Sequence, residues 1–197
     1  MRLFRKVLDG IDVDPLLAQV KAYPADLWGV DDAWTRGKHF PGTGKGNAIL
    51  KAGLAKNNVV LRYNKTPAGL IPDGTKHWDR PPMAVLTEAR PILDRLVTAV
   101  RGRTLGRVII SRMEPGEEIV PHIHTVQFGL PRIFHTFQIP LQVDKDVIFG
   151  CADSDGTVEE LWMRPGGGYT FDNLKYHWVL NESHRRRYAL MVDIEIP

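Results

Sequence analysis

The sequence has only one cysteine, Cys151, so no disulfide can form within the chain. It also has no apolar run near the roughly 20 residues that a membrane-spanning helix requires, which excludes an integral membrane protein of that kind. The first residues, MRLFRKVLDGIDV, interrupt every short apolar stretch with a charge and cannot form the hydrophobic segment of a secretory signal. We therefore expect a cytoplasmic protein without integral membrane association.

The sequence also lacks an excess of one charge and any motif for binding a nucleotide. Lysine and arginine number 26 against 23 acidic residues, a net charge of +3, and both signs are scattered along the chain. This balance differs from the concentrated basic surface of nucleic-acid-binding proteins, so we expect no nucleic-acid partner. A P-loop, the GxGxxG fingerprint and a zinc ribbon are all missing. With 43% hydrophobic residues in 197, the chain can form one domain with a substantial core.

The first half of the sequence reads as a mixture of helices and irregular segments. Asp14 and Pro15 predict the start of a short helix. From Met83 to Val100, apolar residues recur at helical spacing, and Pro91 is expected to kink this region or split it in two. Glycine, proline and lysine interrupt residues 28–80, where we expect loops and two strands.

Residues 106–197 have a different character. Eight short runs rich in β-forming residues follow one another there, separated by turn residues, and no helical period intervenes. This pattern predicts a mainly β fold of the jelly-roll, cupin-like kind. We expect residues 104–197 to form the barrel core and residues 1–103 to form an N-terminal helical and loop cap packed on it, in one compact structural domain.

Histidine is concentrated in this second part of the chain. Five of the seven histidines lie between positions 122 and 184. His122 and His124 have the spacing that places two side chains on one strand face, so both could approach one metal ion, and His177 could supply another ligand. A histidine on a half-buried strand also commonly makes only an ordinary hydrogen bond. The spacing alone leaves both interpretations open.

The residues around these histidines resemble the aspartyl/asparaginyl β-hydroxylase family of Fe(II)- and 2-oxoglutarate-dependent dioxygenases. The similar segments run from Ser111 to His122, from Arg132 to His135 and from Pro165 to His177, and Arg187 is followed by Asp193. They lie within the last half of the chain. The resemblance implies a double-stranded β-helix, Fe(II) as the metal, and 2-oxoglutarate and O2 as co-substrates.

In that family two histidines hold the iron, and by position these are His122 and His177. The family arginine that binds the distant carboxylate of 2-oxoglutarate is matched by Arg187. The residue types suit these roles, because neutral imidazoles bind Fe(II) and arginine pairs bidentately with a carboxylate. Strand alternation places Arg187, Ala189 and Met191 on one face, which we expect to be the inner face of the barrel.

Three further residues of the resemblance are candidates for binding the co-substrate. Ser111 matches a serine that helps to bind a carboxylate of 2-oxoglutarate, and His135 matches a histidine near the co-substrate. Arg132 fits less well, because it precedes His135 by three residues where the family has two, and regular pleating would put the two side chains on opposite faces. A β-bulge at Ile133 or Phe134 would restore the family geometry, and without one Arg132 belongs to the surface or a loop.

His124 occupies a position where many 2-oxoglutarate oxygenases have an acidic residue that completes a triad of two histidines and one carboxylate. The family that this chain resembles does without that carboxylate. Three interpretations of His124 are open: a third metal ligand, a group bonded to a metal-bound water, or a contact for substrate.

The function that the resemblance implies is hydroxylation of an unactivated C–H bond, coupled to oxidative decarboxylation of 2-oxoglutarate. The substrate would be an Asp- or Asn-type side chain, or a small amino-acid-like molecule. Two other functions fit the same pattern. One is a cupin-type metalloenzyme that uses three histidines, including His124, and needs no 2-oxoglutarate. The other is a barrel that binds a ligand without turnover. The sequence does not indicate an oligomeric state.

Overall fold

The computed structural model describes residues 3–29, 57–64, 77–123 and 134–197. Its elements in chain order are β1 (Phe4–Leu8), α1 (Asp14–Ala22), the 3-10 helix η1 (Ala25–Leu27), β2 (Asn58–Asn64), β3 (His77–Asp79), α4 (Pro81–Val85), α5 (Ala89–Ala99), β4 (Thr104–Met113), β5 (Glu118–His122), β6 (Phe134–Gln142), β7 (Val147–Ala152), β8 (Val158–Leu161), β9 (Gly168–Phe171), β10 (Tyr176–Asn181) and β11 (Arg187–Glu195). The fold is mostly β.

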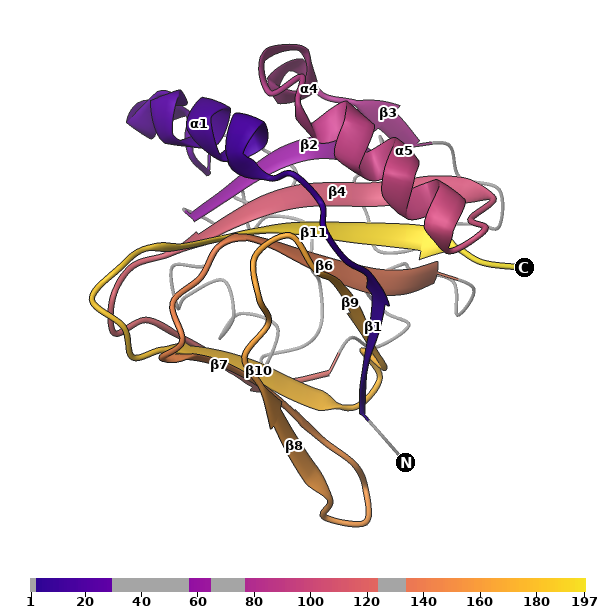
Figure 1. Cartoon of the computed structure of the whole chain (residues 1–197), viewed down its shortest axis with the longest axis vertical. Coiled ribbons are helices and arrows are strands. Elements are labelled where there is room, and N and C mark those ends of the chain that lie inside the picture. The colour runs from indigo at the N-terminus through magenta and orange to yellow at the C-terminus, as the bar shows by residue number, and fades with distance from the viewer. Residues whose placement is uncertain (1–2, 30–56, 65–76, 124–133) are drawn as a thin grey trace, which may run out of the picture.

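Two antiparallel sheets face each other (Figure 1). The large sheet has seven strands in the order β1-β9-β6-β11-β4-β2-β3, and the small sheet has four in the order β5-β10-β7-β8. The chain passes from one sheet to the other several times, for example from β9 in the large sheet to β10 in the small sheet and back to β11. This alternation is typical of a jelly roll and confirms the mainly β, cupin-like fold that the sequence predicts.

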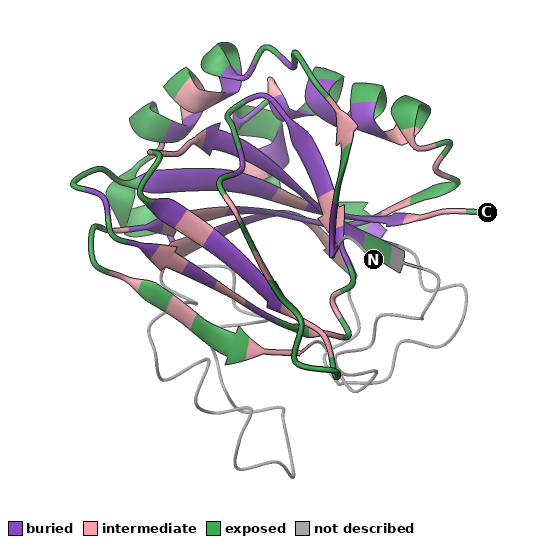
Figure 2. Ribbon diagram, turned by 60° about the horizontal axis from the view of Figure 1, so that its bottom comes forward, coloured by how far each residue is buried: buried purple, intermediate pink, exposed green. Residues whose placement is uncertain are grey.

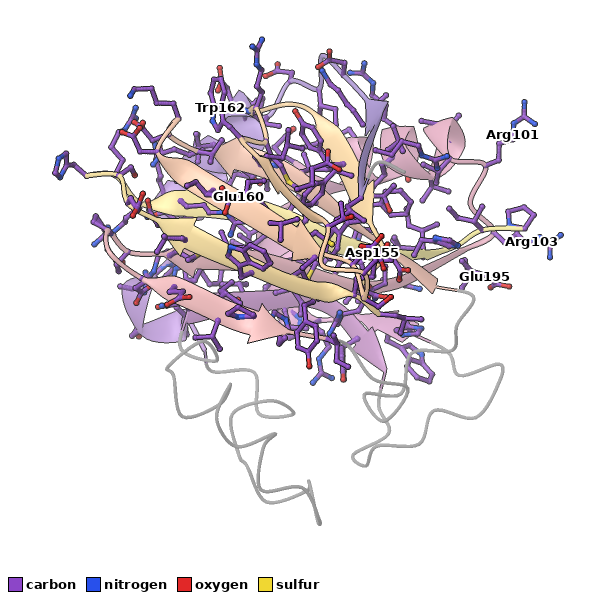
Figure 3. All side chains as sticks on the ribbon, turned by 90° about the horizontal axis from the view of Figure 1, so that it is seen from below. Arg101, Arg103, Asp155, Glu160, Trp162 and Glu195 are labelled. Atoms are coloured by element: carbon purple, nitrogen blue, oxygen red, sulfur yellow. The ribbon has the colours of Figure 1, made fainter. Side chains whose placement is uncertain are left out.

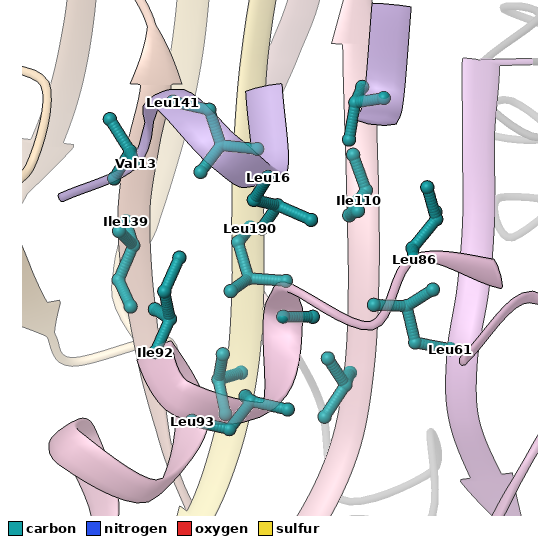
Figure 4. Close-up of a cluster of buried hydrophobic side chains, with 14 of the residues drawn as sticks. Val13, Leu16, Leu61, Leu86, Ile92, Leu93, Ile110, Ile139, Leu141 and Leu190 are labelled. Carbon is teal, nitrogen blue, oxygen red and sulfur yellow. The ribbon is translucent and has the colours of Figure 1, made fainter. Parts of the chain in front are cut away.

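Helices α1, α4 and α5 lie over the outer face of the large sheet, as Figure 1 shows. Alternate residues of the strands point toward the helices and form the larger hydrophobic core with them. The side chains labelled in Figure 4 belong to this core: Val13, Leu16, Leu61, Leu86, Ile92, Leu93, Ile110, Ile139, Leu141 and Leu190. Burial of each such side chain stabilises the fold by about 1.5–3 kcal/mol.

The space between the two sheets holds a second core, and the strands of both sheets are largely buried there (Figure 2). Its members include Phe4, Met113, Phe149, Phe171 and Val179. Three of these are aromatic and contact one another, with ring centroids between 4.9 and 6.2 Å apart. This inner core is the part of the barrel that surrounds the candidate site.

Strand β11 shows how alternation separates the two cores. Tyr188, Leu190 and Val192 face the helices. Arg187 and Asp193, on the opposite parity, are buried on the inner face. The inward direction of Arg187 agrees with the alternation expected from the sequence.

The outer face of the small sheet is open to solvent, as seen from below in Figure 3. Glu160 on the edge strand β8 is exposed there, and Trp162 just after it is 40% exposed. At the centre of this face, Trp178 lies across Gly150. A Cβ atom at position 150 would come within 1.9 Å of the Trp178 ring, so glycine is required where β7 supports β10.

The helical region expected from Met83 to Val100 consists of two helices, α4 and α5. The split that the sequence allowed is present, but the break lies around Leu86 rather than at Pro91. Pro91 is the third residue of α5, where a backbone N–H has no partner within the helix, so the ring is tolerated. Helix α1 begins at Asp14, as expected.

Residues 1–103 contribute three strands to the large sheet. Strands β2 and β3 are the two strands expected within residues 28–80, whereas β1 is not anticipated by the sequence pattern. The division into a cap and a barrel core after residue 103 stays a prediction. Among the described residues, no helix has the length and apolar character needed to cross a membrane.

Candidate functional site

Two of the expected site residues meet in the small sheet. His122 ends β5 and His177 is the second residue of β10, and the antiparallel register pairs them directly. Their ring centroids are 4.2 Å apart and the rings are tilted by 53°. Two imidazoles this close on one strand face can approach a single metal ion together.

Backbone hydrogen bonds orient both rings. His122 Nδ1 lies 2.9 Å from the carbonyl oxygen of Val120, and His177 Nδ1 lies 2.9 Å from that of Lys175. A carbonyl can only accept, so in both rings Nδ1 carries the proton and Nε2 carries the lone pair. A hydrogen bond of this kind commonly fixes the tautomer of a metal-binding histidine.

Burial keeps both imidazoles neutral near neutral pH. Desolvation lowers the pKa of His122, which is half-buried. His177 is only 4% exposed, and desolvation together with the neighbouring His122 lowers its pKa to about 4. A neutral histidine has a lone pair for a metal, so both rings are in a metal-binding form above about pH 6.5.

Aromatic rings shield His177 from water. Phe171 lies 4.8 Å from the His177 ring, and Phe149 is parallel to it at 6.3 Å. Cys151 pairs directly with His177 in the β7–β10 ladder and is fully buried, and burial raises the pKa of its thiol. The side chains beside His177 therefore form an apolar wall.

Arg187 lies on the inner face of the large sheet and is 3% exposed. Its Nη1 lies 3.4 Å from Ser111 Oγ and 3.6 Å from Met113 Sδ. No carboxylate in the described part of the chain forms an ion pair with it. Desolvation lowers its pKa to about 10, so it stays charged at neutral pH. A buried cation without a counter-ion is costly for a protein, unless a ligand supplies the anion.

A second buried arginine on the same face has the partner that Arg187 lacks. Arg107 is 2.8 Å from Asp193, whose other oxygen accepts a hydrogen bond of 2.7 Å from Thr136. Asn173 in turn donates to the Thr136 hydroxyl at 3.0 Å. Nothing in the sequence pointed to Arg107 as the partner of Asp193, because the two are 86 residues apart.

The ion pair of Asp193 is level with the histidines along the barrel. The Phe171 ring contacts the His177 ring. The register of β6 and β9 places Phe171 beside Thr136, and Thr136 pairs with Asp193 on β11. Arg187 is six residues from Asp193 on the same strand. The histidine pair and the arginine thus lie at different depths of one barrel interior.

A buried asparagine holds the turn that leads into Arg187. Asn181 Nδ2 lies 3.0 Å from the carbonyl oxygens of Glu114 and Arg185 and 3.4 Å from that of Met113. Its Oδ1 accepts from the backbone N–H and the hydroxyl of Ser183. Asn181 was not among the residues expected at the site, and the local signal that could have suggested its role is an Asx residue next to a turn.

The other expected site residues are not brought to this place by the described structure. His135 is exposed and pairs with Ile194, which faces the helices, so it lies on the outer side of the large sheet. Its contact with the co-substrate stays a prediction that this placement does not support. His124 and Arg132 fall outside the described residues. Within the described residues, no group of three or more potential metal ligands is present.

Comparison with known proteins gives one family match. Residues 73–197 match the sequence model described as aspartyl/asparaginyl beta-hydroxylase. No protein of curated function matches the chain. The solved structures that share the fold include two with similarity over most of this chain. An oxidoreductase of the 2OG-Fe(II) oxygenase family from Burkholderia pseudomallei has a TM-score of 0.53 and 13% identity over 80% of this chain and 82% of that one. AviO1 from Streptomyces viridochromogenes Tue57 has a TM-score of 0.52 and 14% identity over 98% and 90%.

Proposed function

Because the chain belongs to the aspartyl/asparaginyl β-hydroxylase family, we propose that it is an Fe(II)- and 2-oxoglutarate-dependent dioxygenase. Its reaction would hydroxylate an unactivated C–H bond of an Asp- or Asn-type side chain or of a small amino-acid-like substrate. The 2OG-Fe(II) oxygenase family assignment of the Burkholderia structure is in line with this proposal. The observation that carries it is Arg187, a buried cation in the same barrel as a histidine pair and without a carboxylate partner in the described residues.

The histidine pair fits the metal. In this proposal His122 and His177 bind Fe(II) through Nε2, since Nδ1 of each donates to a backbone carbonyl. Their neutral state suits a divalent cation, and nitrogen is a ligand that Fe(II) accepts. Two protein ligands leave positions for a chelating co-substrate and for O2. Fe(II) and 2-oxoglutarate would together supply the oxidising chemistry when bound.

Arg187 and Ser111 fit the distant carboxylate of the co-substrate. The guanidinium can bind a carboxylate through two parallel hydrogen bonds, and Ser111 Oγ, 3.4 Å from it, can donate a third. Asn181 holds the turn immediately before β11 and so fixes the depth at which Arg187 enters the barrel. The apolar wall of Phe149 and Phe171 would keep water away from the reacting centre.

The direct test of turnover is succinate formation. The Fe(II)-loaded protein is incubated with 2-oxoglutarate in air, and succinate is measured with and without ascorbate. We expect slow O2-dependent succinate formation even without the primary substrate, and its loss in His177→Ala. Metal-dependent oxidation at a rate that does not depend on 2-oxoglutarate would contradict the proposal and favour the three-histidine enzyme. Tight metal binding without any turnover would favour a binding barrel.

A further inference from the structure

Gln138 is a buried polar residue of the barrel interior whose side chain forms no hydrogen bond within the described part of the chain. It lies on β6, is 7% exposed, and its Oε1 has no hydrogen-bond partner within the described residues. Its neighbours on the strand, Phe137 and Ile139, face the helices, so strand alternation directs Gln138 inward. Most buried polar atoms in proteins are hydrogen-bonded, so an unpaired one in a barrel interior points to a bound group.

The register places Gln138 between the two parts of the candidate site. It pairs with Met191 of β11, whereas Thr136 pairs with Asp193 at the level of the histidines and Pro140 pairs with Ala189. Ala189 also pairs with Ser111, the hydroxyl beside the Arg187 guanidinium. Each step of two residues is about 7 Å along a strand. Gln138 is therefore one step from the histidine level and one step from the Ser111 level.

Three other polar residues of this interior have partners within the protein. Arg107 and Thr136 bond to Asp193, and Asn181 bonds to three backbone carbonyls. Gln138 and Arg187 are the exceptions among the described buried polar residues with inward parity on β6 and β11. One elongated ligand with an acidic group at each end would satisfy both.

We propose that Gln138 binds the co-substrate by donating a hydrogen bond from its carboxamide to the carboxylate next to the 2-oxo group. This inference rests on the proposed function and adds a residue to it. A carboxamide carries its donor and its acceptor at equivalent places, and a half-turn about its last torsion exchanges them. The side chain can thus present Nε2 to an anion at the position where Oε1 now lies unpaired. Arg187 and Ser111 would hold the other end of the same molecule.

The assignment predicts opposite effects on stability and on binding. In Gln138→Met the unpaired buried amide is replaced by an apolar side chain of similar shape. We expect the melting temperature of the metal- and ligand-free protein to rise by about 2–4 °C. The same change removes a hydrogen bond to a charged group, so the dissociation constant for 2-oxoglutarate should rise about tenfold or more.

The experiment measures both quantities for the whole chain. Binding of 2-oxoglutarate is titrated calorimetrically without O2 in the Mn(II)-loaded protein, and melting is followed without metal or ligand. Gln138→Glu, which cannot donate when ionised, should bind 2-oxoglutarate more weakly than Gln138→Met. The matched control is Gln19→Met on α1, whose side chain bonds to Thr87 and Glu88 and should leave the dissociation constant unchanged.

Three results would overturn the inference. A lower melting temperature in Gln138→Met would show that the amide has a structural partner. An unchanged dissociation constant in that variant would remove Gln138 from the binding site while leaving the dioxygenase proposal intact. Tighter binding in Gln138→Glu would show that the bound group is a donor, not a carboxylate. If the wild-type protein itself bound no 2-oxoglutarate, the proposed function would fail and this inference with it.

Discussion

Replacing Arg187 separates the cost of burying its charge from its benefit in binding. Burial lowers the pKa of Arg187 to about 10, and this shift corresponds to an electrostatic cost of about 3 kcal/mol for the charged form in the ligand-free barrel. Arg187→Met removes that charge and the contacts of Nη1 with Ser111 Oγ and Met113 Sδ, and it leaves an unbranched apolar side chain in the same place. We therefore expect the ligand-free protein to become more stable, by about 1–3 kcal/mol in urea unfolding.

The same substitution should weaken the binding of 2-oxoglutarate. A bidentate pair with a carboxylate in a buried site contributes about 3 kcal/mol, which corresponds to about a hundredfold in the dissociation constant. Arg187→Ala should show the same loss of affinity with metal binding unchanged. Arg187→Lys should restore only part of it, because an ammonium group cannot form the two parallel bonds.

The neighbouring arginines are the controls for this prediction. Arg185 is exposed, and Arg186 is exposed and bonded to Glu114 at 2.8 Å. Alanine at either position should leave both stability and affinity within the error of the measurement. Equal losses of affinity at all three arginines would indicate diffuse surface charge and would rule out a specific role of Arg187 in binding the carboxylate. A less stable Arg187→Met would do so as well, because it would mean that the buried charge is already compensated.

Three further predictions concern the histidines. His122→Ala and His177→Ala should each abolish stoichiometric Fe(II) binding with circular dichroism unchanged, and iron retained by both would remove the metal assignment. If His124 is a metal ligand, His124→Gly should weaken iron binding sharply and His124→Asp should preserve it. An iron affinity that neither substitution changes would show that His124 is not a ligand. Because the pKa of folded His177 is lowered to about 4 from 6.5, the unfolded chain binds the extra proton first as pH falls. Stability should therefore decline by up to about 1.4 kcal/mol per pH unit between pH 6.5 and 4 on account of this residue, and His177→Gln should remove that share of the slope in urea titrations.

The strands of the second half of the chain were predictable because each is a short β-rich run bounded by turn residues. Strand alternation placed Arg187 on one face with Ala189 and Met191, and the family resemblance made this the expected inner face. The contact of Arg187 with Ser111 agrees with that direction. The exact break between α4 and α5 was not predictable, since a proline in the first turn of a helix and a proline at a break look alike in the sequence. Strand β1 was missed because its pairing with β9 joins residues 160 or more positions apart.

The polar interior of the barrel was the least predictable part. Arg107 and Asp193 form an ion pair because β4 and β11 are neighbours in the sheet. No local pattern in either strand predicts this pair. In the sequence, Gln138 is one polar residue within a strand. Only the fold shows that its buried Oε1 has no hydrogen-bond partner within the described residues. His135 matches a family histidine near the co-substrate, but in the fold it lies on the outer face of the large sheet.

The proposed function requires that Fe(II) and 2-oxoglutarate bind together in this barrel. Joint binding can be observed by titrating the Fe(II)-loaded protein with 2-oxoglutarate under anaerobic conditions and following the visible absorption. Chelation of Fe(II) by a 2-oxo acid produces a metal-to-ligand charge-transfer band. We predict that this band appears and saturates at one equivalent in the wild-type protein, and that Arg187→Ala needs about a hundredfold more 2-oxoglutarate to reach it. Iron bound stoichiometrically with no such band at any concentration of 2-oxoglutarate would contradict the account.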